Sequence, residues 1–167
     1  MHEPEVVAEL HTGILLTQLG YDRLQKELEY LTTVKRPEIA DRIRESQQHG
    51  EFSEDNNELD EVKFEQAMVE NRIAELKTIF GNAQVLEESM ISADRVGIGS
   101  KVTVNDLEWD DQFDVRVVSS IEADPSEDLI SNESPMGMAL MGGSAGKTVE
   151  FDTPDGKKKY KIVTISK

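Results

Sequence analysis

The sequence has 167 residues, of which 34 are acidic and 18 are basic, and its formal net charge is −16. Nucleic-acid phosphates repel so acidic a surface, which argues against free DNA or RNA as the primary partner and favours a basic protein cavity. Without cysteine, the chain has no disulfide scaffold, thiol catalysis or thiolate zinc site. No apolar run approaches the roughly 18 residues of a membrane span, and the acidic start is unlike a secretion signal. We therefore expect a cytoplasmic protein with no membrane partner.

The first helix is predicted to begin after an N-terminal extension formed by residues 1–16. Thr17 is a suitable N-cap residue, and apolar residues recur at helical spacing after it. Pro37 is expected to kink this helix or to start a new one, because proline has no backbone N–H. The polar segment at 50–59 opens with Gly50 and predicts a turn.

The second helix carries the clearest pattern in the chain, a seam whose members alternate steps of three and four and include one polar residue. The seam consists of Leu59, Val62, Gln66, Val69, Ile73, Leu76 and Phe80. Such spacing is typical of a coiled coil. Two long helices joined by a short loop bury their stripes by packing against each other. Residues 17–82 are therefore predicted to form an antiparallel coiled coil with an acidic tip near 50–59.

The second half of the chain changes to the period of β-strands after a linker predicted at residues 83–99. The predicted strands are 102–104, 113–118, 149–151 and 160–165. Asp155-Gly156 predicts a hairpin turn, and Ser134-Pro135 predicts the start of a short helix, with serine as N-cap and proline at the first helical position. Residues 100–167 are therefore predicted to be a small α+β domain, and the whole chain is predicted to be a two-domain α+β protein.

The predicted tip is rich in carboxylates, and no basic residue lies among them. The acids are Glu51, Glu54, Asp55, Glu58, Asp60 and Glu61. Such a run is usually solvated surface. The alternative is metal chemistry, because Mg²⁺ often takes one or two carboxylates and completes its shell with phosphate and water. Glu51 and Glu54 are three apart and share one side of a helical turn, so they are candidates to complete a partner's metal site, with Asp55 and Glu58 as further ligands.

Several short segments stand out by their order and spacing along the chain: 16–24, 36–39, 50–54, 60–63, 72–73, 82–83, 130–131, 134–140 and 153–156. Together they resemble the GreA/GreB-type transcript cleavage factors of bacterial RNA polymerase. The resemblance implies an N-terminal antiparallel coiled coil followed by an FKBP-like domain that binds polymerase. It also implies that the coiled coil enters the polymerase secondary channel and that its acidic tip helps to hold a magnesium ion and the attacking water. Backtracked nascent RNA is then cleaved near its 3′ end by the polymerase, so the factor itself is not an enzyme.

The resemblance also implies roles for particular residues. The paired tip acids of the family fall on Glu51 and Glu54, which become the candidate catalytic and metal-binding residues. The magnesium is expected to be shared with the polymerase active site and not bound tightly by the chain alone. A basic patch on the coiled coil is implied to contact RNA or polymerase, and its candidates are Lys35, Arg36, Arg42 and Arg44. The alternative is that these four pair with neighbouring acids such as Glu38, Asp41 and Glu45.

The second domain is implied to dock on polymerase near the channel entrance. Its candidate docking residues are Ser134, Pro135 and Met136, which alternatively serve only to build the short helix and fill gaps in the core. The closed seam of the coiled coil predicts a monomer.

The tip departs from the family pattern at three points. Glu51 stands where Asp is usual, the stretch 54–59 carries one extra residue, and Leu59 replaces a common Tyr. Since catalytic geometry tolerates errors of only about 1 Å, a regulator that occupies the same channel without cleavage remains an alternative. A stand-alone metal-dependent hydrolase is a second alternative, although a hairpin tip offers neither a pocket nor enough converging ligands. A third is a structural adaptor that tolerates loss of both tip acids.

Overall fold

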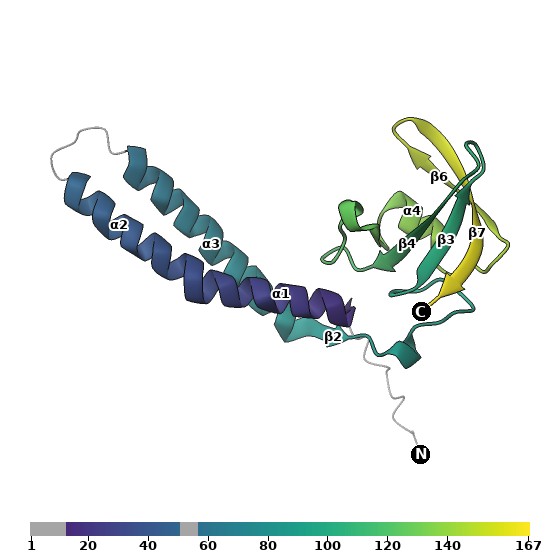
Figure 1. The fold of residues 1–167 in the computed structure, drawn as a ribbon, viewed down its shortest axis with the longest axis horizontal. Helices are drawn as coiled ribbons and strands as arrows, with labels where there is room; N and C mark the ends of the chain where they lie inside the picture. The colour runs from purple at the N-terminus through teal and green to yellow at the C-terminus, as the bar shows by residue number, and fades with distance from the viewer. Residues whose placement is uncertain (1–12, 51–56) are drawn as a thin grey trace, which may run out of the picture. The chain divides into compact units, whose positions relative to one another are not determined.

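The structure is a computed structural model that describes residues 13–50 and 57–167. It comprises two compact units (Figure 1). Residues Tyr21–Asn82 form a helical unit, and Ala83–Lys167 form a second unit together with the described residues up to Gly20. The predicted two-part α+β fold is confirmed. None of the helices in the described ranges combines the length and apolarity that crossing a bilayer requires.

The helical unit is an elongated hairpin whose first arm is one continuous rod. Helix α1 (Gln18–Tyr30) runs through a π-helical turn, Leu31–Lys35, into α2 (Arg36–Gly50). Pro37 explains this turn, because it has no N–H to donate to the carbonyl of Thr33. The helix widens by one residue there, and the N–H of Arg36 donates to the Leu31 carbonyl. The second arm is α3 (Asn57–Asn82).

A narrow apolar seam holds the two arms together. Ile39 of α2 packs with Val62, Val69 and Ile73 of α3, all buried. The predicted seam is wrong at Gln66, which is exposed, and it omitted Ile79, which is buried. Ile79 lies near the end of the seam, where an α-helix of 3.6 residues per turn has drifted from a strict seven-residue repeat. Gln66 lies between two buried members, but its amide is costly to bury without hydrogen-bond partners.

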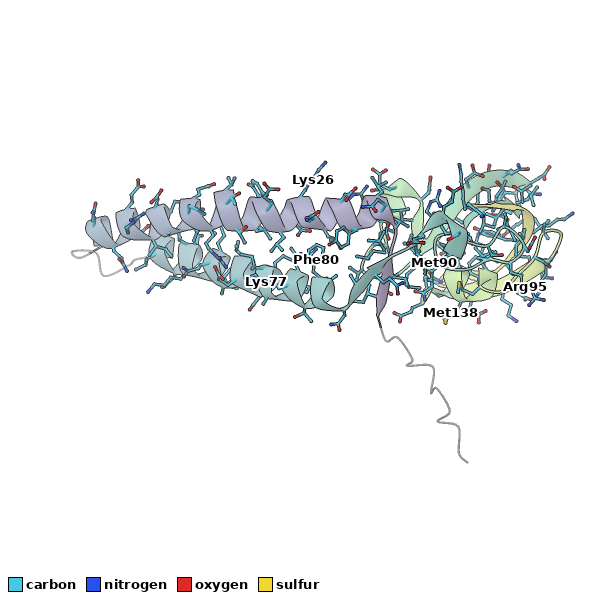
Figure 2. The ribbon with its side chains drawn as sticks, turned by 90° about the horizontal axis from the view of Figure 1, so that it is seen from below. Lys26, Lys77, Phe80, Met90, Arg95 and Met138 are labelled. Atoms are coloured by element: carbon cyan, nitrogen blue, oxygen red, sulfur yellow. The ribbon has the colours of Figure 1, made fainter. Side chains whose placement is uncertain are left out.

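An aromatic contact follows at the base of the hairpin. The rings of Tyr21 and Phe80 meet edge to face, with centroids 5.2 Å apart. Figure 2 shows the Phe80 side chain between the two arms.

The second unit contains a five-stranded sheet in the order β5-β4-β3-β7-β6. Its strands are β3 (Lys101–Asp106), β4 (Asp111–Val118), β5 (Leu129–Ser131), β6 (Thr148–Thr153) and β7 (Gly156–Ser166). Neighbouring strands are antiparallel except for the parallel pair β4–β5. Helix α4 (Pro135–Leu140) begins at the residue that the sequence predicts, and two short 3₁₀ turns, Glu88–Met90 and Pro125–Glu127, connect strands.

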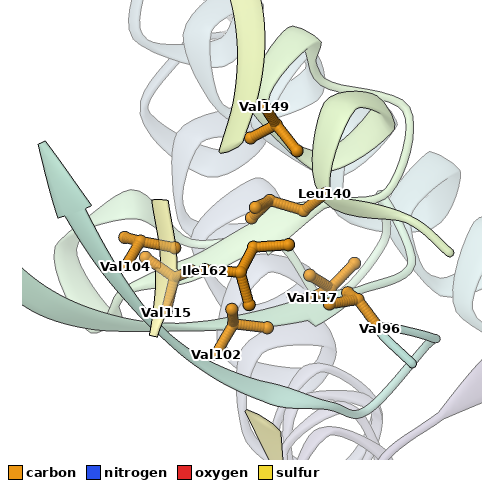
Figure 3. Packing of buried hydrophobic residues seen from close by; sticks show 8 residues of the cluster. All are labelled: Val96, Val102, Val104, Val115, Val117, Leu140, Val149 and Ile162. Carbon is orange, nitrogen blue, oxygen red and sulfur yellow. The ribbon is translucent and has the colours of Figure 1, made fainter. Parts of the chain in front are cut away.

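The core of this unit is formed by strands β3, β4, β6 and β7, by helix α4 and by the segment before β3. Its buried residues are Val96, Val102, Val104, Val115, Val117, Leu140, Val149 and Ile162. Their side chains point toward one another, with Leu140 and Ile162 near the centre (Figure 3). Burial of each large side chain contributes about 1.5–3 kcal/mol.

Two segments that the sequence analysis treated as an extension and a linker have regular structure. Ile14–Leu16 form strand β1, which pairs in parallel with β2 (Ala83–Val85). Leu16 is fully buried, and its carbonyl accepts a 2.8 Å hydrogen bond from the N–H of Leu86. Val96, inside the predicted linker 83–99, belongs to the core. Apolar residues in these short stretches had no periodicity to mark them.

Candidate functional site

The predicted catalytic and metal-binding acids Glu51, Glu54 and Asp55 lie outside the described residues. Glu58 is described, and it is exposed in the first turn of α3. A carboxylate at this position interacts favourably with the positive end of the helix dipole. Within 13–50 and 57–167, no group of three or more His, Cys, Asp or Glu is placed to hold a metal ion. The metal site therefore stays a prediction that rests on the tip sequence.

The basic residues predicted to contact RNA or polymerase are engaged in ion pairs. Arg36 holds Glu70 of α3 through two 2.8 Å hydrogen bonds. Lys35 and Arg42 both reach Glu65, each at 2.8 Å. These partners sit on the facing helix and not among the own-helix acids that the sequence alternative named. Only the register of the two helices reveals such pairs.

Two further pairs complete the description of the hairpin surface. Arg44 pairs with Asp41 one helical turn away, as the sequence alternative predicts for that residue. Arg72 of α3 binds Glu27 of α1 through hydrogen bonds of 2.7 and 2.9 Å. From Glu27 to Arg36 to Arg42 on the first arm, the partner on α3 moves from residue 72 to 70 to 65, so the two arms are antiparallel.

Hydrogen bonding shifts the pKa values of Lys35, Glu65 and Glu70 in the direction that keeps each of them charged. The bonds from Lys35 and Arg42 lower the pKa of Glu65, and the bond from Arg36 lowers the pKa of Glu70. The bond to Glu65 raises the pKa of Lys35. A basic residue already neutralised in this way attracts an RNA phosphate less than a free one does. These ion pairs therefore stabilise the contact between the two arms, and they leave less free positive charge for a basic patch.

The predicted docking residues at the start of α4 have clear structural roles. The hydroxyl of Ser134 accepts a 3.0 Å hydrogen bond from the N–H of Gly137 and donates a 2.6 Å bond to the carbonyl of Ser131. Pro135 is exposed at the first helical position, and Met136 packs against the core. Met138, on the outer side of the same helix, is 62% exposed (Figure 2). Of the three predicted residues, Pro135 is the most open to a partner.

A cavity of about 420 Å³ opens beside this helix start. Its walls include Ile14, Ile98, Ile121, Ser119 and Glu133. The hydroxyl of Ser119 is buried and has no hydrogen-bond partner among the described residues.

Glu133, which the sequence analysis missed, is fixed in place at this cavity. Its carboxylate accepts a 2.7 Å hydrogen bond from the Ser120 hydroxyl, and its N–H donates to the Ser131 hydroxyl. Its position directly before the predicted N-cap Ser134 was the one available signal. The cavity rim therefore presents an oriented carboxylate next to the predicted docking residues.

A second missed residue, Glu122, caps the first helix from the sheet unit. Glu122 is 8% exposed, and its carboxylate accepts hydrogen bonds from the N–H of Thr17, at 3.0 Å, and from the Thr17 hydroxyl. The Thr17 hydroxyl in turn accepts from the N–H of Gly20, which confirms Thr17 as the N-cap. A Cβ at position 20 would overlap the Glu122 side chain, so any other residue there would displace this carboxylate from Thr17.

Both halves of the chain match known families. Residues 14–85 match the family described as "Transcription elongation factor, N-terminal", and residues 91–167 match "Transcription elongation factor, GreA/GreB, C-term". The chain is 34% identical to "GreA factor homolog 1 (Gfh1) protein of Thermus thermophilus", a solved structure, with 93% of this chain and 99% of that chain covered and a TM-score of 0.43.

Curated relatives are more similar in sequence. Transcription elongation factor GreA of Acetivibrio thermocellus is 49% identical over 154 residues, which covers 92% of this chain and 96% of the relative. GreA of Clostridioides difficile is 48% identical over 157 residues, covering 94% and 98%. With nearly full-length matches at this identity and both halves of the family present in order, the chain belongs to the GreA/GreB family of transcription elongation factors.

Proposed function

We propose that this chain binds bacterial RNA polymerase as a monomer, inserts its hairpin into the secondary channel and stimulates the cleavage of backtracked nascent RNA near its 3′ end. Membership of the GreA/GreB family supports the polymerase as the partner. The observation that carries the proposal is the braced hairpin. Helix α3 alone has 26 residues, or about 39 Å at about 1.5 Å per residue. Ion pairs join α3 to the facing arm, so the hairpin is a braced support for the segment that connects α2 and α3.

The tip carboxylates Glu51 and Glu54 are the working groups of the proposal. Carboxylate oxygen is the donor that magnesium prefers, and one or two such groups suffice where a partner supplies the remaining ligands. When bound there, a magnesium ion would polarise the phosphodiester and lower the pKa of a coordinated water. The chain's own contribution is to fix the two carboxylates at the end of a stiff arm, because positioning alone lowers a barrier substantially. The chain performs no hydrolysis without the polymerase.

The cavity rim next to α4 is proposed as the docking edge. The oriented Glu133 carboxylate lies at that rim, and the exposed Pro135 follows two residues later at the start of α4. An anionic group beside an apolar one fits a basic protein surface, and opposite charges speed association and select the partner.

The second candidate is a regulator that occupies the channel without stimulating cleavage. The observation that favours it is the tip sequence, with Glu51 one methylene longer than the usual Asp and one residue added between Glu54 and Leu59. An added residue changes the direction in which both carboxylates point.

The test is RNA cleavage in stalled, backtracked polymerase complexes with magnesium. The double variant Glu51→Ala/Glu54→Ala should lose about a hundredfold or more in stimulated cleavage rate. Asp152→Ala/Asp155→Ala is the matched control, since it removes two exposed acids with the same spacing from the β6–β7 hairpin. Retained cleavage in the tip variant would contradict the proposal. Slower elongation without any cleavage by the unaltered chain would establish the regulator instead.

A further inference from the structure

The turn between β3 and β4 exposes the largest apolar side chain of the protein. Trp109 is 73% exposed and Leu107, in the same turn, is 45% exposed. Trp109 is also the only tryptophan in the sequence. Two large apolar side chains exposed in one turn contribute no burial free energy to the monomer, and such exposure is typical of an interaction site. Residues 107–110 are called the Trp109 turn below.

The conformation of the Trp109 turn is stabilised by hydrogen bonds to neighbouring residues and to β7. The Asn105 side-chain amide donates to the Asp110 carboxylate at 3.1 Å, and the N–H of Glu108 donates to the Asp106 carboxylate at 2.9 Å. The N–H of Leu107 donates to the carbonyl of Lys159 in β7 at 3.0 Å. A preformed turn loses little conformational entropy on binding, which favours affinity. Its exposed indole is therefore presented in a fixed place.

Charge around the turn selects the kind of partner. Glu108, Asp110 and Asp111 are exposed beside Trp109. Among the described residues, Lys158 forms an ion pair with Glu108 at 3.7 Å. The remaining negative charge repels nucleic-acid phosphates and anionic lipid headgroups. A basic protein surface with an apolar pocket satisfies both the indole and the carboxylates, and tryptophan is enriched among residues that dominate such interfaces.

We propose that the Trp109 turn docks on a basic, pocketed surface of RNA polymerase and forms a contact separate from the tip and from the rim at Glu133. The inference rests on the proposed function, because that function supplies the partner. Trp109 fills the pocket, Leu107 covers one side of it, and the carboxylates meet basic side chains at its edge.

The single tryptophan makes the test direct. The chain is produced with 5-hydroxytryptophan at position 109, which can be excited where the ordinary tryptophans of polymerase barely absorb. Because the chain has no cysteine, a dye on Asp155→Cys reports complex formation independently through its anisotropy. Acrylamide quenching of residue 109 is then measured in the free chain and in the complex. A several-fold fall in quenching on binding is the expected result.

Other outcomes of this experiment overturn the proposal in distinguishable ways. Dye anisotropy that rises while quenching stays unchanged overturns the Trp109 contact and leaves polymerase binding intact. No rise in anisotropy overturns the proposed function and this inference together. Protection of residue 109 in the free chain, whether constant or growing with chain concentration, overturns the assignment to polymerase in favour of a contact within the chain or with a second copy.

Affinity gives a second readout. Trp109→Ala should weaken polymerase binding at least about tenfold. Added salt should also weaken the binding of the unaltered chain, because it screens the attraction between the carboxylates and the basic surface. Met90→Ala is the matched control, because Met90 is another exposed apolar residue of the same unit, 46% exposed (Figure 2). Equal affinities of the two variants would overturn the inference.

Discussion

The helical hairpin and the sheet unit bury their apolar residues in opposite ways. The sheet unit encloses eight buried residues in one cluster, contributed by four strands, helix α4 and the segment before β3. The hairpin has one cluster of four buried residues along its seam, further buried apolar residues at Leu24, Leu76 and Ile79, and cross-helix ion pairs on its surface. A side chain lost from a closed core leaves a cavity that the surrounding strands cannot close, whereas two helices can draw together over a gap in a seam. Each substitution should therefore cost more free energy in the sheet unit than in the hairpin.

The largest expected effect is the loss of a side chain from the centre of the closed core. Leu140→Ala should destabilise the sheet unit by about 3–5 kcal/mol, since a fully buried leucine leaves a cavity that the surrounding strands cannot close. Calorimetry of thermal unfolding measures it. Met138→Ala on the exposed side of the same helix should stay within about 0.5 kcal/mol. Similar losses for the two variants would contradict the closed-core description.

A seam substitution should cost less and remain local. Ile73→Ala should destabilise the hairpin by about 2–3 kcal/mol, at the lower end for buried isoleucine, because two helices can draw together over a gap in a seam. The helical circular dichroism signal should melt earlier, while the calorimetric transition of the sheet unit stays in place. Met68→Ala, exposed on the same helix, is the control. If both signals move together, the two units unfold as one and the contrast between them fails.

The cap at the start of α1 offers a test in which the sign of the effect is decisive. Replacing glycine by alanine inside a helix usually stabilises by about 1 kcal/mol. Gly20→Ala should instead destabilise by about 1 kcal/mol, because Glu122 must move and the N–H of Thr17 loses its acceptor.

Gly81→Ala is the control for this cap, since a Cβ at position 81 meets no atom within 4 Å and should stabilise α3. Thermal unfolding of both variants gives the two signs. Stabilisation by both would show that Glu122 is not held by Thr17.

Much of this architecture was predictable because its signals are local. The seam positions Val62, Val69 and Ile73 follow from spacing, and the turn at Asp155-Gly156 and the helix start at Ser134 follow from the preferences of single residues. Of the two errors in the seam, Ile79 lies near its end, where helical drift accumulates, whereas Gln66 lies between the buried Val62 and Val69 and has an amide that is costly to bury. Periodicity predicts which face of α3 is apolar better than it predicts which single residue on that face is buried.

The missed features depend on contacts between distant positions. Glu122 lies 105 residues from Thr17, and nothing near it in the sequence distinguishes it from the other acids. The pairing of Arg36 with Glu70 needs the register of two helices, which composition does not contain. Strand β1 has three residues, too few to establish an alternating pattern. The tip acids stand on sequence alone, because they lie outside the described residues.

The smallest expected effect is the acid sensitivity of the hairpin. Glu65 and Glu70 have pKa values lowered from the usual 4.5 by hydrogen bonds from Lys35, Arg42 and Arg36. A carboxyl whose pKa is lower in the folded state stabilises that state fully above its unfolded pKa and loses the contribution as pH falls through the folded value. The hairpin should therefore lose stability as the pH falls below about 4.5, and salt should reduce the effect because these groups are solvent-accessible.

The double variant Glu65→Gln/Glu70→Gln isolates this contribution. Its helical melting temperature should be lower than that of the unaltered chain at neutral pH, and the difference should shrink as the pH falls below about 4.5, because the unaltered carboxyls are then protonated too. Glu87→Gln/Glu88→Gln, exposed in the sheet unit, is the control for the change in net charge. If the gap between the double variant and the unaltered chain persists in acid, packing of these side chains and not their charge would brace the hairpin. The two units would then differ in the shape of their cores and not in the forces that hold them.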